Sequence, residues 1–426
     1  MNILVLTPIV PYPPHDGDKL RLYHFLKYLK SKGHKIDLFC VSRVRSDFQY
    51  AEQLRPLCRH MEFHSISNFE LFFNLLGGLL MGQSLNVASH FSPPLRDSLK
   101  AYWRGPKGKS IDVVLAHRLR MAPTAFEDNP GKPVVMDFTD SLTSYFGQLR
   151  GMSGARLTRR LAAWWDYWFI RREEVEWGEK AFQSLLISDF DAQVLREQGL
   201  YEDKVTVIPN GVESIKVGRT PKGGLYPKGR PVVCFVGNMG YAANEDGALW
   251  FLNKMWPQVK ESVPDAVFAA VGGNPRKVLQ KYHNGKDVLV TGWVPQIEPY
   301  VAQATVTIAP LRIAAGMQNK VGLALQMGVP VVATAQAVAW LPPAGREGVI
   351  VAGGEDLFAR EVAEALWDPK KARAVARVGR RFVLNHYRWK DSGRKLEQTL
   401  QKAVKAAKAS RLSFDTEPGL LEGLEV

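Results

Sequence analysis

The sequence predicts an α/β protein with two facing, doubly wound Rossmann-like domains. Three observations predict this fold. Short β-rich runs alternate with amphipathic segments in both halves, a Gly/Pro/Lys-rich stretch at 218–231 interrupts that alternation, and 426 residues exceed what one ordinary core holds. Because 46% of the residues are hydrophobic, two packed cores can form and wholesale disorder is excluded.

The first domain is predicted to cover residues 1–210 and to hold six or seven strands. NILVLT at 2–7 leads into a helix from about Asp18 to Ser31. Further strands are expected at KIDLFCV (35–41), MEFHSI (61–66), IDVVLA (111–116), KPVVMDF (132–138), SLLIS (184–188) and KVTVIPNGV (204–212). Helical segments between them indicate a parallel sheet covered on both faces.

The second domain is predicted to cover residues 211–386, where the alternation restarts. Five strands are expected at VVCFVG (232–237), AVFAAVGG (266–273), DVLVTG (287–292), VTIAP (306–310) and VPVVAT (329–334). A basic helix within 387–412 follows and is expected to pack back on the first domain through Leu396, Leu400 and Val404, which recur at helical spacing. The tail at 413–426 is expected to be loose.

The net charge of +14 is concentrated near the C-terminus. The segment from Lys370 to Leu412 carries 14 Lys or Arg residues and two acids, so it alone contributes +12. Such a local basic patch favours an anionic membrane surface as a partner. Nucleic acid is not favoured, because aromatic residues are not interleaved with the basic run.

Cysteines and apolar runs indicate a cytoplasmic protein, and the basic terminal helix favours peripheral contact with the inner face of the plasma membrane. Three widely spaced cysteines fit a reducing compartment. The N-terminal MNILVLTPIVPYPP reads as a strand and not as a signal peptide. FELFFNLLGGLLMGQ at 69–83 is shorter than the roughly 20 residues of a spanning helix. AAWWDYWFIRREEVEW at 162–177 is interpreted as a core helix with a charged rim, with an interfacial contribution as the alternative.

Glycines follow four predicted strands of the second domain, and they point to a nucleotide site. They are Gly237 and Gly240, Gly272 and Gly273, Gly292, and Gly316. A glycine at a strand end lets the backbone approach a ligand, and the next helix offers free amides to phosphate. In GMQNK, Lys320 and the amides near Gln318 and Asn319 are suited to a diphosphate.

Polar residues also follow strands of the first domain. In PPHDGDKLR at 13–21, Asp16 and Asp18 either bind sugar hydroxyls or cap the helix. Gly17 permits close approach of a ligand, while Lys19 and Arg21 could reach across a cleft. His117 ends one strand, where it either binds a sugar or has a structural role. Asp137 and Asp140 end another strand, and the same two readings apply.

Three motifs together resemble retaining glycosyltransferases of family 4. They are VIPNGV at 207–212, TGWV at 291–294, and the G-x-x-x-K turn followed by MGVPVVAT. PPHDGDKLR and NKV, with the glycine and valines of MGVPVV, resemble more closely the exosortase-associated sugar transferases of bacterial exopolysaccharide clusters. The likeness runs over nearly the full chain. It implies the GT-B fold, with a substrate cleft between two Rossmann-like domains and a C-terminal helix crossing back.

The resemblance also implies a function and a site. A hexose would pass from a nucleotide-diphosphate sugar to a glycan or lipid-linked acceptor with retention, without metal or cofactor, in surface polysaccharide biosynthesis. His117 and Lys320 would be catalytic. The donor would be bound by Gly17, Gly237, Asn238, Trp293, Val294, Gly316, Met317, Gln318, Asn319 and Val321. The acceptor side would include Asp16, Asp18, Arg21 and Asp140.

The sequence departs from the family at two positions. Members usually have two glutamates, eight positions apart, that flank the turn and hold the donor sugar and the ribose. Ala315 and Leu323 stand at these positions here, and neither side chain can form a hydrogen bond. This departure motivates the alternative of a non-catalytic GT-B protein that acts as a scaffold or partner of another transferase.

Overall fold

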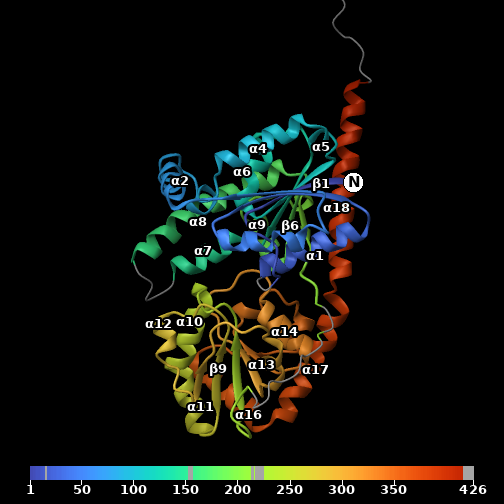
Figure 1. Ribbon diagram of the computed structural model, residues 1–426. Helices are drawn as coiled ribbons and strands as arrows, with labels where there is room; N and C mark the ends of the chain where they lie inside the picture. The colour runs from blue at the N-terminus through green and yellow to red at the C-terminus, as the bar shows by residue number, and fades with distance from the viewer. Residues whose placement is uncertain (15–16, 152–156, 213–214, 216–224, 416–426) are drawn as a thin grey trace, which may run out of the picture.

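The computed structural model describes residues 1–14, 17–151, 157–212, 215 and 225–415. It contains two separate parallel sheets, each with helices packed around it, stacked one above the other (Figure 1). The predicted pair of Rossmann-like domains is confirmed.

The sheet of the first domain has seven parallel strands in the order β3-β2-β1-β4-β5-β6-β7. The strands are β1 (Asn2–Thr7), β2 (Lys35–Ser42), β3 (His60–Ser65), β4 (Val113–His117), β5 (Val134–Thr139), β6 (Gln183–Leu186) and β7 (Val205–Val207). The strand order reverses between β1 and β4, and ligands of open α/β sheets bind beyond the carboxyl ends of strands at such a reversal.

The sheet of the second domain has six parallel strands in the order β10-β9-β8-β11-β12-β13. The strands are β8 (Val232–Val236), β9 (Val267–Val271), β10 (Val288–Val290), β11 (Val306–Ala309), β12 (Val331–Ala333) and β13 (Ile350–Val351). The sequence did not predict β13, because a strand of two residues has no periodicity to detect.

Helices connect these strands and lie along both sheets. They are α1 (Gly17–Ser31), α2 (Asn68–Leu80), α3 (Leu85–Ala88), α4 (Pro93–Arg104), α5 (Pro106–Lys109), α6 (Ala122–Glu127), α7 (Leu142–Arg150), α8 (Leu157–Lys180), α9 (Asp189–Glu197), α10 (Ala242–Trp250), α11 (Trp256–Ser262), α12 (Lys277–Gln280), α13 (Glu298–Gln303), α14 (Asn319–Met327), α15 (Pro343–Arg346), α16 (Glu355–Trp367), α17 (Pro369–His386) and α18 (Trp389–Asp415). A π-helical turn, Phe251–Met255, joins α10 to α11.

The C-terminal helix α18 crosses back to the first domain, as predicted (Figure 1). Its residues Leu396 and Leu400 are fully buried in the core that α1 shares with the first sheet. The chain therefore passes between the domains twice. The two passages lie together, because the amide of Val212 donates to the carbonyl of Tyr387 at 2.7 Å.

The Trp-rich helix α8 is oriented differently from the prediction. Its carboxylates Glu173 and Glu174 are buried, whereas Trp164 and Trp168 are about half exposed. Glu174 accepts hydrogen bonds from the first amides of α7, including that of Leu142 at 2.7 Å. The interpretation of a core helix with a charged rim is therefore wrong for these residues, because the acids face inward to cap neighbouring helices. Among the described residues, no helix is both long enough and apolar enough to span a bilayer.

A buried ion pair joins the elements of the first domain at the carboxyl edge of its sheet. Arg21 of α1 is fully buried, and its Nε and Nη2 donate to the Asp137 carboxylate on β5 at 2.9–3.0 Å. Nη1 of Arg21 donates to the Ile208 carbonyl at 2.6 Å and to Asn210 Oδ1 at 3.2 Å. Burial alone would raise the pKa of Asp137, but Arg21 and His117 hold it well below its usual range.

We expect Arg21→Met to destabilise the protein by about 3–5 kcal/mol, because the substitution leaves the Asp137 carboxylate buried without its cation. Chemical denaturation measures the free energy of unfolding. Arg55→Met is the matched control, since Arg55 pairs with Glu52 on the exposed surface, and this variant should unfold like the wild type. Equal stability of the two variants would contradict a structural role for the buried pair.

Candidate functional site

Lys320 is a half-buried cation in the first turn of α14, the helix that follows β11 in the chain. Its Nζ donates to Asn244 Oδ1 at 2.9 Å and to Gln318 Oε1 at 3.3 Å. Both acceptors are neutral amides, and no carboxylate among the described residues forms an ion pair with this lysine. Burial lowers the pKa of Lys320 to about 8. An incompletely compensated cation at a helix N-terminus favours an anionic ligand.

The turn after β8 adjoins this lysine. Asn244 of α10 donates through Nδ2 to the carbonyl of Asn238 at 2.9 Å, and a Cβ on Gly237 would lie 2.7 Å from the same Nδ2. The predicted residues Gly237, Asn238, Gln318 and Lys320 are therefore brought together. Asn244 was missed, although its place in the first turn of the helix after a glycine turn is a usable signal.

Two predicted glycines lie where the domains meet. A Cβ on Gly17, at the start of α1, would lie 2.6 Å from Nδ2 of Asn319 in the second domain. Gly316 has φ +66°, and a Cβ there would lie 2.9 Å from Cβ of Asp140 in the first domain. The carboxyl edges of the two sheets therefore face each other, with Lys320 following directly on the residue opposite Gly17.

Polar contacts fix this approach of the domains. The Gln148 side chain of α7 accepts from the Ala314 amide at 2.9 Å and donates to the Ala314 carbonyl at 2.8 Å. Asp191 of α9 accepts from the Gly316 amide at 3.2 Å. These contacts were missed, because they join residues more than 100 positions apart and no local pattern marks them.

His117 ends β4 and is oriented by the buried ion pair. Its Nδ1 lies 2.9 Å from Oδ2 of Asp137. Its Nε2 is buried and has no hydrogen-bond partner among the described residues. Because Asp137 engages one ring nitrogen, the other remains for a ligand at the sheet edge.

Arg118 joins two of the predicted acceptor-side residues. Its guanidinium is 3.5 Å from Oδ1 of Asp18 and contacts the carboxylate of Asp140 more closely. The backbone of Arg118 has φ +69°, which is uncommon for a residue with a side chain and is found at functional sites. Sequence reasoning missed Arg118, although its position directly after His117 was a signal. Of the other two acceptor candidates, Arg21 is described below and Asp16 lies outside the described residues.

Several predicted side chains point elsewhere. Arg21 cannot contact an acceptor, because it is fully buried and bonded to Asp137. Met317 and Val321 are buried in the second core, so they can offer only main-chain atoms to a donor. Val294 packs against the same core. Trp293 is 70% exposed, and its ring lies next to Gly273, where an added Cβ would be 3.7 Å from Cδ1 of the tryptophan.

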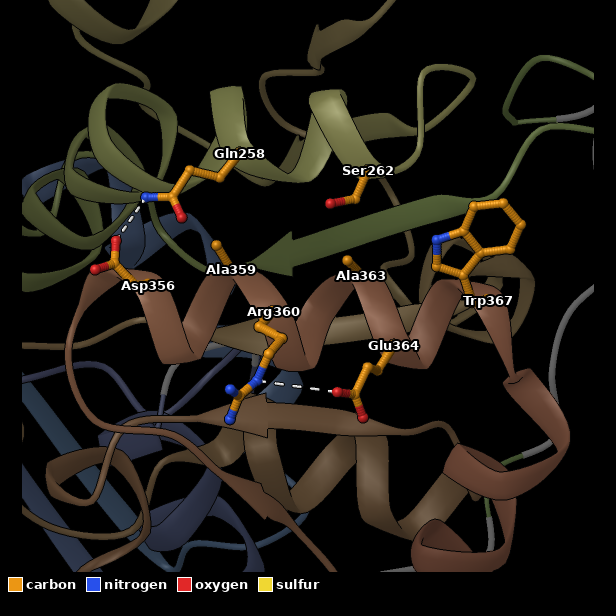
Figure 2. A pocket seen from close by; sticks show the side chains of 8 residues that line it. All are labelled: Gln258, Ser262, Asp356, Ala359, Arg360, Ala363, Glu364 and Trp367. Atoms are coloured by element: carbon orange, nitrogen blue, oxygen red, sulfur yellow. Dashed lines mark hydrogen bonds and ion pairs between the residues drawn. The ribbon is translucent and has the colours of Figure 1, made fainter.

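A surface groove lies away from this site, between α11 and α16 (Figure 2). Its lining includes Gln258, Trp367 and the Arg360–Glu364 ion pair, in which the charged atoms are 3.9 Å apart. These helices lie at the far end of the second domain from the first (Figure 1). None of the predicted site residues lines the groove.

Comparison with known proteins points to sugar transfer. Residues 230–368, about a third of the chain, match the family model described as glycosyl transferases group 1. A GDP-mannose-dependent alpha-(1-6)-phosphatidylinositol monomannoside mannosyltransferase of Mycolicibacterium smegmatis is 28% identical over 197 residues. This match covers 42% of the chain and 50% of that protein, so the chain spans about half the length of this relative. The two matches support a glycosyltransferase.

Solved structures establish the fold. Sucrose-phosphate synthase from Thermosynechococcus elongatus matches with a TM-score of 0.69 and 16% identity, over 95% of this chain and 100% of that one. HepE of Anabaena in complex with UDP-glucose matches with a TM-score of 0.64 and 13% identity, over 94% and 100%. A glycosyltransferase from Rickettsia africae matches with a TM-score of 0.63 and 14% identity, over 95% and 99%. The predicted GT-B architecture is confirmed.

We expect Lys320→Met to weaken the binding of UDP or GDP roughly 10- to 100-fold, the size of one charge-assisted hydrogen bond. Wild-type affinity should also fall as the pH rises above about 8, because the free lysine then loses its proton. Isothermal titration calorimetry across this range measures both effects. Lys281→Met, on the exposed surface of the same domain, should behave like the wild type. An unchanged affinity in Lys320→Met would remove Lys320 from the site.

Asp191 should make the stability of the protein depend on pH. Burial, together with the charge of Asp140, raises the pKa of Asp191 from 3.8 to about 6. Between these values the folded state holds a proton that the unfolded state has lost, so stability falls as the pH rises through this window.

The Asp191→Asn variant should lose this dependence, on the order of 2 kcal/mol between about pH 4 and pH 6. Denaturant unfolding at both ends of the window measures it. Asp189→Asn is the matched control, because Asp189 is exposed on the same helix. If Asp191→Asn keeps the wild-type slope, the carboxylate does not titrate in this range.

Proposed function

We propose that this protein transfers a hexose from a nucleoside-diphosphate sugar to a glycan or lipid-linked acceptor, with retention of configuration and without a metal ion. One observation carries the proposal. The half-buried Lys320, whose Nζ donates to the amide oxygens of Asn244 and Gln318, lies where the carboxyl edges of two Rossmann-like sheets meet. This arrangement favours binding of a diphosphate between the domains.

The chemistry follows from where charge develops. As the bond from the sugar to the diphosphate breaks, negative charge grows on the leaving phosphate oxygens. Lys320 and the first amides of α14 stabilise that charge without reorganising. The free Nε2 of His117 holds a donor-sugar hydroxyl, while Asp137 fixes the ring. The acceptor hydroxyl attacks from the side that the diphosphate leaves and gives its proton to a departing phosphate oxygen.

The relatives narrow the choice of donor and acceptor. One uses GDP-mannose and acts on a phosphatidylinositol mannoside, and another is solved with UDP-glucose. We therefore propose a GDP- or UDP-sugar as donor, with its base against the exposed ring of Trp293. The proposal places the reaction in the synthesis of a surface polysaccharide at the cytoplasmic face of the membrane.

A second candidate function is that of a non-catalytic scaffold. Ala315 has no polar side-chain atom, and Leu323 packs against the second core, so neither can hold sugar or ribose hydroxyls. Against this candidate, the carboxylate of Asp140 lies beside Gly316 from the facing domain. Asp140 thus offers an acid near the donor sugar, although it comes from a different part of the chain.

Binding of a panel of UDP- and GDP-sugars separates the two candidates. We expect one of them to raise the melting temperature, because a ligand at 100 times its Kd adds about 2.7 kcal/mol to the stability of the folded state. Transfer to a membrane-extracted lipid acceptor, followed by mass spectrometry of the product, then tests turnover. If no nucleotide or nucleotide sugar binds, the transferase proposal fails and the scaffold remains.

A further inference from the structure

The first domain carries an apolar surface that no part of the described chain covers. We call it the α2/α8 surface. Its side chains are large, apolar and exposed, and they are Phe69, Phe72, Phe73, Leu76, Leu79, Leu80, Met81, Leu157, Leu161, Trp164 and Trp168. On each helix they recur at spacings of three and four residues, so each helix presents one apolar face to its surroundings.

Helix α2 is held at the surface without a core of its own. Gly78 is the only residue of α2 that is buried, whereas Leu80 is 81% exposed and Phe69 is 73% exposed. Its sole charged residue, Glu70, is engaged in a capping box with Ser67. Exposing this much apolar side chain to water is unfavourable, and an apolar surface of this extent marks a contact site.

Helix α8 lies beside α2 (Figure 1), and its exposed Trp164 and Trp168 give it the same kind of face. Gly82, just after α2, contacts α8 in two ways. Arg172 of α8 donates to the Gly82 carbonyl at 2.9 Å, and a Cβ on Gly82 would lie 3.2 Å from the Phe169 ring of α8. Glu173 binds the amide of Ser84 at 2.8 Å. Asp166, Glu173 and Glu174 are turned inward, and the exposed Glu176 lies near the end of α8 that follows this stretch. Over 157–172 the outward side of α8 therefore combines tryptophans with cations.

The combination of tryptophans and arginines indicates which kind of partner binds the α2/α8 surface. The exposed charged side chains described between 157 and 172 are Arg160, Arg171 and Arg172, while Asp166 is buried. Trp and Arg beside an apolar helix face are favoured at the boundary between lipid headgroups and acyl chains, and cations add attraction to anionic lipid. A helix of 13 residues is too short to span a bilayer of about 30 Å, so it lies in the plane of the interface.

The α2/α8 surface adjoins the junction between the domains. Ala163, next to the exposed Trp164, is buried in a small cluster with Ala243 and Ile313 of the second domain. A bilayer in contact with Trp164 therefore lies at the edge of the proposed site. The basic helix α18, in contrast, lies on the opposite side of the first domain (Figure 1), so one flat membrane cannot contact both.

We propose that the α2/α8 surface docks on an anionic bilayer and brings the junction between the domains to the lipid that carries the acceptor. The proposal deepens the proposed function, on which it rests for the lipid-linked acceptor. Its occupant is the membrane itself, recognised through apolar insertion and the arginines of α8. The donor site plays no part in the docking.

Vesicle flotation of the full chain tests the proposal. The probes are vesicles of phosphatidylcholine with phosphatidylglycerol, and of phosphatidylcholine alone. We expect binding to the anionic vesicles, and a loss of at least about tenfold in two separate variants, Phe69→Ser/Phe73→Ser/Leu80→Ser on α2 and Trp164→Ser/Trp168→Ser on α8. Trp367→Ser is the matched control, because this exposed tryptophan lies on the far groove (Figure 2). It should bind like the wild type.

Three results would overturn the proposal. In the first, the α2 and α8 variants bind vesicles like the wild type, but binding is lost in Lys402→Ser/Lys405→Ser/Lys408→Ser. That result would assign docking to α18. In the second, the wild-type protein floats with neither kind of vesicle. In the third, size-exclusion chromatography shows that the wild type is a dimer and that the α2 variant is a monomer. That result would make a second copy of the chain the partner of this surface. Calorimetry with UDP and GDP separates the two proposals, because the variants should keep the wild-type donor affinity even where docking is lost.

Discussion

The ion pair between Arg21 and Asp137 holds the carboxyl edge of the first sheet in place, and the proposed site is built on that edge. It connects α1, β5 and the segment after β7, and the same carboxylate orients His117. Arg118 and Asp140 follow directly on β4 and β5, so their positions depend on the same network. A buried ion pair contributes little net stability against an apolar replacement, but it engages one nitrogen of His117 and leaves the buried Nε2 without a partner among the described residues.

Ala315 and Leu323 stand in place of the two glutamates that the family resemblance led us to expect, and glycines lie where the domains meet. Gly17 lets Asn319 approach, and Gly316 lets Asp140 approach. The resulting environment contains a cation whose hydrogen-bond partners, Gln318 and Asn244, carry no charge. Such an environment suits the dianionic phosphate group of the proposed donor, and under that proposal the selectivity for a sugar has to come from the facing domain.

Much of the fold was predictable, because strands and helices each produce a periodic pattern of apolar residues within a short stretch of sequence. The glycine turns and Lys320 were predictable for the same reason. The sequence could not show in which direction each side chain points. Arg21, Met317 and Val321 fit a site by position, yet their side chains point into a core. On α8 the glutamates became inward-facing caps only because the amides of α3 and α7 lie opposite them, and no pattern within the helix contains that information.

The pairing of Val212 with Tyr387 has a consequence for movement between the domains. Two neighbouring stretches of backbone, tied to each other by a hydrogen bond, form the whole covalent connection between the halves. A single linker would permit twisting in any direction, whereas a paired one resists torsion and leaves bending about one axis as the soft mode. Opening along this axis would separate Gly17 from Asn319 without sliding one sheet edge past the other, so the two halves would close again in the same register.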